Sequence, residues 1–170
     1  MQSWSNYFGN KFAWNFGGLW ADPFKIKNVD LKVEYTRISP YVYTHWDSLN
    51  IYTHYDKIIG NPQGPNSDAI YIELGWQASR DFRIEINAEQ RQNGAGSANT
   101  VTRPAEGVRK DFLKGVVEKR TIVGFRIVDQ IRRDLFVSMS YAYQNTENLQ
   151  LDPGATSTDH LARIQLTFNY

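Results

Sequence analysis

The sequence contains no cysteine, which excludes a disulfide framework and any metal site built from thiolates. It contains no run of 18 apolar residues, so no segment is suited to cross a membrane as a helix. Its 19 basic and 18 acidic residues leave a net charge of +1, which gives no strong field for nucleic acid. No helical i, i+3, i+4 stripe of any length occurs. The 170 residues are enough for one sizeable domain.

Alternation of apolar and polar residues is what the sequence has in quantity. It is clearest in the last eleven residues, where every second residue from Ala162 to Tyr170 is apolar and the residues between them are polar. A period of two predicts a β-strand. Similar segments predict further strands upstream. The predicted strands lie near residues 11–21, 29–43, 68–78, 82–93, 119–131, 134–147 and 160–170.

These strands are long, and their connections differ in length. A globular strand has about 5–6 residues, whereas a tilted strand needs about 9–11 to cross a bilayer. The connections at 22–28, 79–81 and 132–134 are short, whereas those near 44–67, 94–118 and 148–158 are long. Short turns on one side and long loops on the other are typical of outer-membrane barrels. The sequence therefore predicts an all-β, antiparallel transmembrane β-barrel over residues 1–170, with a soluble β-domain as the alternative.

The number of predicted strands raises a question of completeness. Bacterial single-chain barrels have an even number of strands, and seven are clear here. Residues 2–9 could supply an eighth, although they alternate poorly. Otherwise the chain is the C-terminal part of a larger barrel. Residues 1–5 lack a basic and an apolar signal region, so a secretory signal was either removed or belongs to a longer protein.

Two segments resemble a known family. Residues 33–45 hold a Glu-Tyr strand, Glu34-Tyr35, followed by a Pro-x-x-Tyr turn from Pro40 to Tyr43. Residues 60–68 are rich in glycine and proline and end in Gly-Pro-Asn-Ser-Asp before the next strand. Together they resemble the C-terminal region of the capsule-assembly Wzi family over about residues 11–94.

The resemblance implies a large outer-membrane barrel that acts as a lectin for capsular polysaccharide, without enzymatic activity or a cofactor. Its implied partners are outer-membrane lipid and lipopolysaccharide, capsular polysaccharide, the barrel-assembly machinery and a missing N-terminal part of the barrel. Nucleic acid is not among them. A pore or structural subunit is the alternative, and a membrane-embedded hydrolase is a third reading.

Aromatic and basic residues in the long loops are the candidates for sugar binding. The apolar C–H faces of pyranose rings can lie on aromatic rings, and cations can meet acidic capsule or phosphate groups. The alternatives are an aromatic belt at the membrane interface and a solvated loop. The candidates are Tyr41, Tyr43, Trp46, Tyr52, Tyr55, Arg103, Arg109 and Lys110.

Charged residues at alternate strand positions predict a polar network in the lumen. If 79–81 is a tight turn, Tyr71 faces Glu89 and Glu73 faces Asn87, so the glutamates share one face. Paired carboxylates could act in a glycosidase, but we favour ion pairing with arginines of the same face. The predicted lumen residues are Glu73, Arg83, Glu85, Glu89, Arg91, Arg126 and Arg163.

The opposite face is predicted to meet lipid, and the chain end to carry an assembly signal formed by Leu166, Phe168 and Tyr170. The predicted outward residues are Ile70, Ile72, Leu74, Phe82, Ile84, Ile86, Phe125, Val137, Met139, Ile164, Leu166 and Phe168.

The three histidines form no metal-binding motif, so no metal site is predicted.

Overall fold

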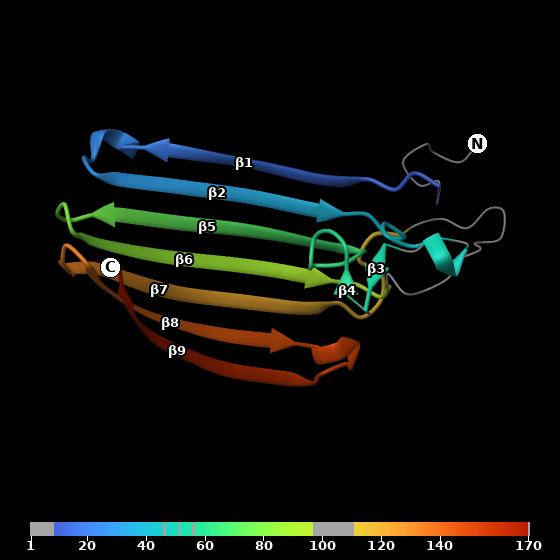
Figure 1. Cartoon of the computed structure of the whole chain (residues 1–170). Helices are drawn as coiled ribbons and strands as arrows, with labels where there is room; N and C mark the ends of the chain where they lie inside the picture. Colours follow the sequence, from blue (N-terminus) through green and yellow to red (C-terminus); the bar gives the residue numbers. More distant parts are fainter. Residues whose placement is uncertain (1–8, 46, 51, 56, 97–110, 170) are drawn as a thin grey trace.

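The computed structural model describes residues 9–45, 47–50, 52–55, 57–96 and 111–169. They form one antiparallel seven-stranded sheet in the order β1-β2-β5-β6-β7-β8-β9, in which neighbours in the chain are neighbours in the sheet (Figure 1). Its strands are β1 (Ala13–Ala21), β2 (Val29–Ile38), β5 (Ser67–Gln77), β6 (Phe82–Asn93), β7 (Glu118–Arg132), β8 (Leu135–Glu147) and β9 (Thr156–Phe168).

Smaller elements lie in the connections. A two-residue hairpin, β3 (Thr53–His54) with β4 (Lys57–Ile58), sits in the loop between β2 and β5. The described single-turn helices are η2 (Pro23–Lys25), η3 (Ser48–Asn50) and η4 (Leu149–Leu151). No helix in the described ranges is long and apolar enough to cross a membrane.

The antiparallel all-β prediction is confirmed, but a closed barrel is not found. In the described part of the chain β1 and β9 are the edge strands and do not pair with each other. The predicted asymmetry of the connections is present. The short turns β1–β2, β5–β6 and β7–β8 lie at one end of the sheet, and the long loops lie at the other (Figure 1).

Several predicted boundaries were wrong. The strand expected at 29–43 ends at Ile38, because Tyr41 and Tyr43 adopt φ values of 68° and 71° that end an extended strand. The last strand begins at Thr156, so the loop expected at 148–158 ends at residue 155. The possible eighth strand at 2–9 lies outside the described residues.

The pairing register confirms the predicted division into two faces. Tyr71 pairs with Glu89 and Glu73 with Asn87, as expected from the turn at 79–81. Side chains alternate along each strand, and paired residues of neighbouring strands point to the same face. The pairing therefore assigns every residue of the seven strands to one of two faces. All twelve residues predicted to point outward share one face. This apolar face has exposed side chains such as Ile86 (55%) and Ile164 (73%).

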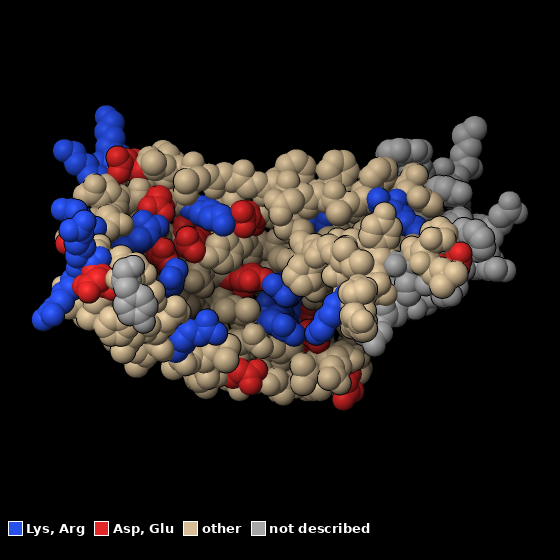
Figure 2. Space-filling model, in the orientation of Figure 1, with Lys and Arg blue, Asp and Glu red and all other residues tan. Residues whose placement is uncertain are grey.

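The other face, called here the polar face, carries most of the charged residues of the strands. Figure 2 shows Lys, Arg, Asp and Glu mixed over the middle of the side in view. Little of the described chain is fully buried. The buried side chains of Ile38, Val42 and Ala69 lie at or next to the long-loop end of the sheet. That end therefore holds the nearest thing to a conventional core.

Candidate functional site

An ion-pair network occupies the polar face near the short turns. The Arg83 guanidinium donates to both carboxylate oxygens of Asp30, at 3.0 and 2.8 Å, and its Nε donates to Glu85 at 2.8 Å. Arg126 lies 3.5 Å from the other oxygen of Glu85. The four residues link β2, β6 and β7. Planar two-point contacts of this kind are geometrically specific and fix the side chains that make them.

Gly75 makes the longest of these contacts feasible. Asp30 pairs with Gly75 across β2 and β5, and Gly75 pairs with Glu85 across β5 and β6. A Cβ at position 75 would lie 2.2 Å from Nη2 of Arg83 and 2.6 Å from Oδ2 of Asp30. The missing side chain therefore leaves the path by which Arg83 crosses β5 to reach Asp30.

Further pairs continue the network toward the loops. Arg91 binds Glu89 at 2.6 Å and Arg120 binds Glu118 at 3.1 Å. The hydroxyl of Tyr71 donates to Glu73. Arginines therefore pair with Glu85 and Glu89, whereas Glu73 is bound by the Tyr71 hydroxyl and makes no ion pair within the described residues. Arg163 lies opposite Ser140 in the register and makes no ion pair within the described residues.

Sequence reasoning missed Asp30, Glu118 and Arg120 as members of this network. The alternation of β2 and β7 would have placed them on the polar face. The pairing of Asp30 with Arg83 also requires the register across the long β2–β5 loop, which local patterning does not supply.

The aromatic candidates in the β2–β5 loop divide into structural and exposed residues. The Tyr43 hydroxyl accepts a hydrogen bond from the Asn61 amide at 3.1 Å, and its ring leaves no room for a Cβ at Gly60. Tyr41 is half-buried. Tyr52 and Tyr55 are 61% and 89% exposed. Among the described aromatic candidates, Tyr52 and Tyr55 therefore present the most surface to an external ligand.

Lys11 and Thr44 help to hold this loop. The Lys11 ammonium donates to the Thr44 carbonyl, and the Thr44 hydroxyl donates to the Tyr41 carbonyl at 2.7 Å. Burial lowers the pKa of Lys11. The loop is thus tied to the residues just before β1.

Asn66 joins two long loops. Its amide Nδ2 donates to the Ala95 carbonyl at 2.8 Å, and its Oδ1 accepts from the Leu113 amide at 2.9 Å. The side chain is buried, and the residue has φ 56°, a conformation that asparagine tolerates. The side chain of Asn66 therefore bonds to the β6–β7 loop, a non-local contact that the sequence pattern of residues 60–68 does not reveal.

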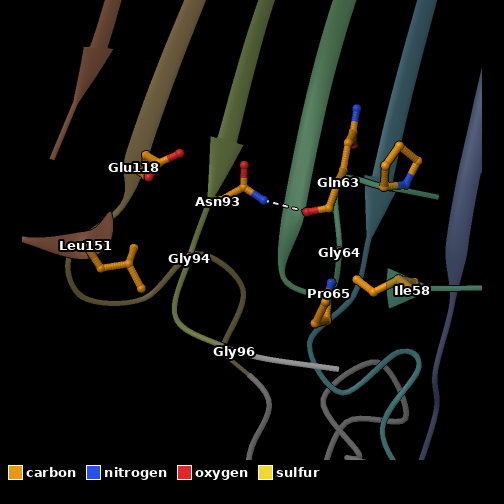
Figure 3. A pocket seen from close by; sticks show the side chains of 10 residues that line it. Ile58, Gln63, Gly64, Pro65, Asn93, Gly94, Gly96, Glu118 and Leu151 are labelled. Carbon is orange, nitrogen blue, oxygen red and sulfur yellow. Dashed lines mark hydrogen bonds between the residues drawn. The ribbon is translucent and has the colours of Figure 1, made fainter. Parts of the chain in front are cut away.

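A depression of about 280 Å³ lies beside this junction (Figure 3). The amide of Asn93 donates to the Gln63 carbonyl at 2.7 Å across it, and Gln63 Oε1 is buried without a partner in the described chain. A second depression, of about 340 Å³, lies between segment 61–63 and the polar face. Its walls include residues of β1, β2, β5 and β6. Segment 61–63 therefore folds back over the polar face.

The remaining candidates lie outside the described residues. They are Trp46, Arg103, Arg109, Lys110 and Tyr170. Leu166 and Phe168, the other two residues of the predicted assembly signal, are exposed on the apolar face. Among the residues that the structure describes, no group of three His, Cys, Asp or Glu side chains could hold a metal ion.

The sheet is antiparallel, with one apolar face, one ion-paired polar face and its long loops at a single end. These features are those of the class of membrane proteins built from β-strands. The family model described as Capsule assembly protein Wzi matches residues 4–161. The chain belongs to this family. No curated protein and no solved structure matches it.

Family membership confirms the resemblance and extends it well beyond residues 11–94. Proteins of this family are outer-membrane β-barrels that take part in capsule assembly without acting as enzymes. The chain is therefore an outer-membrane protein, and capsular polysaccharide is involved in its function. Because the family is not enzymatic, the glycosidase and hydrolase hypotheses are rejected.

Proposed function

We propose that the chain forms part of a single outer-membrane barrel domain that binds and retains capsular polysaccharide as a lectin. The polar face would line the lumen, and the long-loop end would form the sugar surface. The observation that carries this proposal is the exposure of Tyr52 and Tyr55 at the end where the long loops gather. Capsule-assembly family membership supplies the ligand class.

The chemistry of the loop end suits a saccharide. Exposed tyrosine rings offer apolar faces to pyranose C–H groups while their hydroxyls stay available for hydrogen bonds. The Asn66 junction holds the neighbouring loops in place, so less ordering is needed when a ligand binds. Arg103, Arg109 and Lys110 would add contacts to acidic groups of the polymer.

The polar face favours a second candidate, a pore or structural subunit. Most of its charged residues form ion pairs with each other, which suits the wall of a water-filled or plugged lumen. Ion conductance across a planar bilayer would distinguish a pore from a structural subunit. A lectin with a plugged lumen would conduct poorly.

Capsule retention on cells tests the lectin proposal. The variant Tyr52→Ala with Tyr55→Ala should lose retained polysaccharide, whereas Tyr52→Phe with Tyr55→Phe should keep most of it because the rings remain. Surface levels of each variant, measured by antibody, serve as the control for assembly. Retention equal to the parent in the double Ala variant would contradict the assignment of these rings.

The ionic contact is tested separately. A triple Ala variant at Arg103, Arg109 and Lys110 should bind an acidic capsule less tightly at low salt, and the difference should shrink at high salt because exposed charges are screened. If the triple variant matches the parent at every salt concentration, these cations do not contact the polymer.

A further inference from the structure

Basic residues gather at the short-turn end of the sheet, opposite the long loops. Lys25 and Lys27 lie in the β1–β2 turn, Arg80 in the β5–β6 turn, and Arg132 and Arg133 at the β7–β8 turn. In Figure 2, Lys and Arg crowd the left end, which is the short-turn end in Figure 1. The polar network of the sheet does not account for this grouping.

Most of these cations are exposed and form no ion pair with another described residue. Lys25, Lys27, Arg132 and Arg133 are exposed, and none forms an ion pair with another described residue. Arg80 only approaches its neighbour Asp81, at 3.8 Å, and its side chain is 95% exposed. These cations are therefore available to an external anion.

The β1–β2 turn sets its lysines beside the apolar face. Phe24 and Ile26 alternate with Lys25 and Lys27, and both apolar side chains are exposed, by 77% and 56%. The Phe24 ring lies 4.8 Å from the ring of Trp20, which the register places on the apolar face. The turn thus continues the lipid-facing surface and adds charges at its margin.

A β-bulge produces a similar arrangement at the β7–β8 turn. Gln130 pairs with Phe136 and Arg132 with Leu135, which leaves Ile131 as the extra residue. Leu135 belongs to the apolar face, where it pairs with Phe168 of β9. Bulges re-aim side chains, and this one places Arg132 at an apolar-face position that a regular register would give to Ile131.

We propose that this turn-end collar, defined as Lys25, Lys27, Arg132 and Arg133 with Phe24 and Ile131, binds the phosphate groups of anionic phospholipids. Exposed apolar side chains next to cations suit the boundary between acyl chains and headgroups. The short turns of such barrels lie on the periplasmic side, so the lipid is that of the periplasmic leaflet. Cations spread over two turns along one margin fit a layer of headgroups better than a single soluble ligand.

Two native tryptophans allow a local test. Trp20 and Trp14 both belong to the apolar face, but Trp20 lies at the short-turn end and Trp14 at the long-loop end. The full chain, keeping one of them and with its other tryptophans replaced by Phe, is refolded into phosphatidylcholine vesicles containing some phosphatidylglycerol. In one preparation the phosphatidylcholine carries brominated acyl chains, and in the other the phosphatidylglycerol does. Quenching of tryptophan fluorescence then reports which lipid lies beside the ring.

Trp20 should be quenched by brominated phosphatidylglycerol beyond its bulk share, by on the order of fivefold, because each cation near an anionic lipid surface contributes to attraction. Trp14 should show no such enrichment. The enrichment at Trp20 should be abolished in a variant that combines Lys25→Gln, Lys27→Gln, Arg132→Gln and Arg133→Gln. The loop-end pair Lys57→Gln and Lys114→Gln should leave it unchanged.

The salt dependence of quenching is an independent measurement, made on the single-tryptophan chain with its four cations intact. It tests the proposal even if the four-residue variant does not assemble. Enrichment at Trp20 should fall at high ionic strength because exposed charges are screened. Equal quenching by the two lipids at Trp20, equal enrichment at Trp14, or enrichment that survives high salt would each overturn the proposal.

Discussion

The two faces of the sheet are made from the same strands but are stabilised in different ways. On the polar face, side chains bind each other, as Arg83 does with Asp30 and Glu85. On the apolar face, large side chains such as Ile86 and Ile164 stay exposed and have no cover from the described chain. The polar face therefore carries its own partners, whereas the apolar face has no cover from the described chain, and we propose that lipid of the outer membrane covers it.

Placing a charge on each face in turn should give the largest contrast. Ile86 and Asn87 are neighbours near the middle of β6 and point to opposite faces. Ile86→Arg should cost about 2–4 kcal/mol of unfolding free energy in lipid vesicles, because an arginine near the bilayer midplane loses its hydration. Denaturant titration of the vesicle-inserted chain measures this loss.

Asn87→Arg is the matched control. It adds the same charge one residue away, on the polar face beside Glu85 and Glu89, and should cost much less. Equal losses at the two positions would show that the apolar face does not meet lipid.

Removal of the central arginine should give the next largest effect. Arg83→Met leaves Asp30 and Glu85 without their main partner on a half-buried surface, and should cost about 2 kcal/mol after allowance for partial exposure. Gly75→Ala should reproduce part of this loss, because its methyl group would push Arg83 off Asp30. Denaturant titration of both variants in vesicles measures the effect.

Arg83→Lys separates charge from geometry. Lysine keeps the charge but cannot make the planar two-point contact, so an intermediate loss is expected. If Arg83→Met is as stable as the parent, the network does not stabilise the polar face.

The faces could be predicted because alternation is a local property of each strand. Strand parity for β5 and β6 followed from Ser79-Arg80-Asp81 alone, and the observed pairing of Gln77 with Arg83 agrees. The end of β2 could not be predicted in this way. Apolar residues recur at Tyr41, Val42 and Tyr43, but Pro40 has no N–H for the ladder, and Tyr41 and Tyr43 adopt left-handed backbone, so the strand ends at Ile38.

The loop end was predicted less well because its contacts are non-local. The signal Gly-Pro-Asn-Ser-Asp indicated a defined turn, but nothing in it shows that Asn66 bonds to Ala95 and Leu113. The shift of Arg132 by a bulge is equally invisible to a strict period of two. Such features depend on which segments meet, which one alternating pattern does not specify.

The loop junction tests whether polar partners also order the end of the sheet. Asn66→Ala removes two hydrogen bonds from a buried site and leaves the Leu113 amide and the Ala95 carbonyl without their partner, at a cost of about 1–2 kcal/mol. Hydrogen exchange at the Leu113 and Gly94 amides should accelerate. Asn66→Gly keeps the positive φ and loses only the side chain, so a difference between the two variants measures the backbone contribution.

The smallest effect is expected for an ion pair of which both side chains are open to water. Lys32 pairs with Glu34 at 3.3 Å, but both side chains are 40% exposed. Water and salt compete with such a pair, so Lys32→Gln should change the unfolding free energy by less than about 0.5 kcal/mol. Denaturant titration in the same vesicles, compared with Arg83→Met, measures the difference. A loss at Lys32 as large as the loss at Arg83 would mean that burial does not set the strength of these pairs, and that the polar face acts as one coupled network in which each charge supports the others.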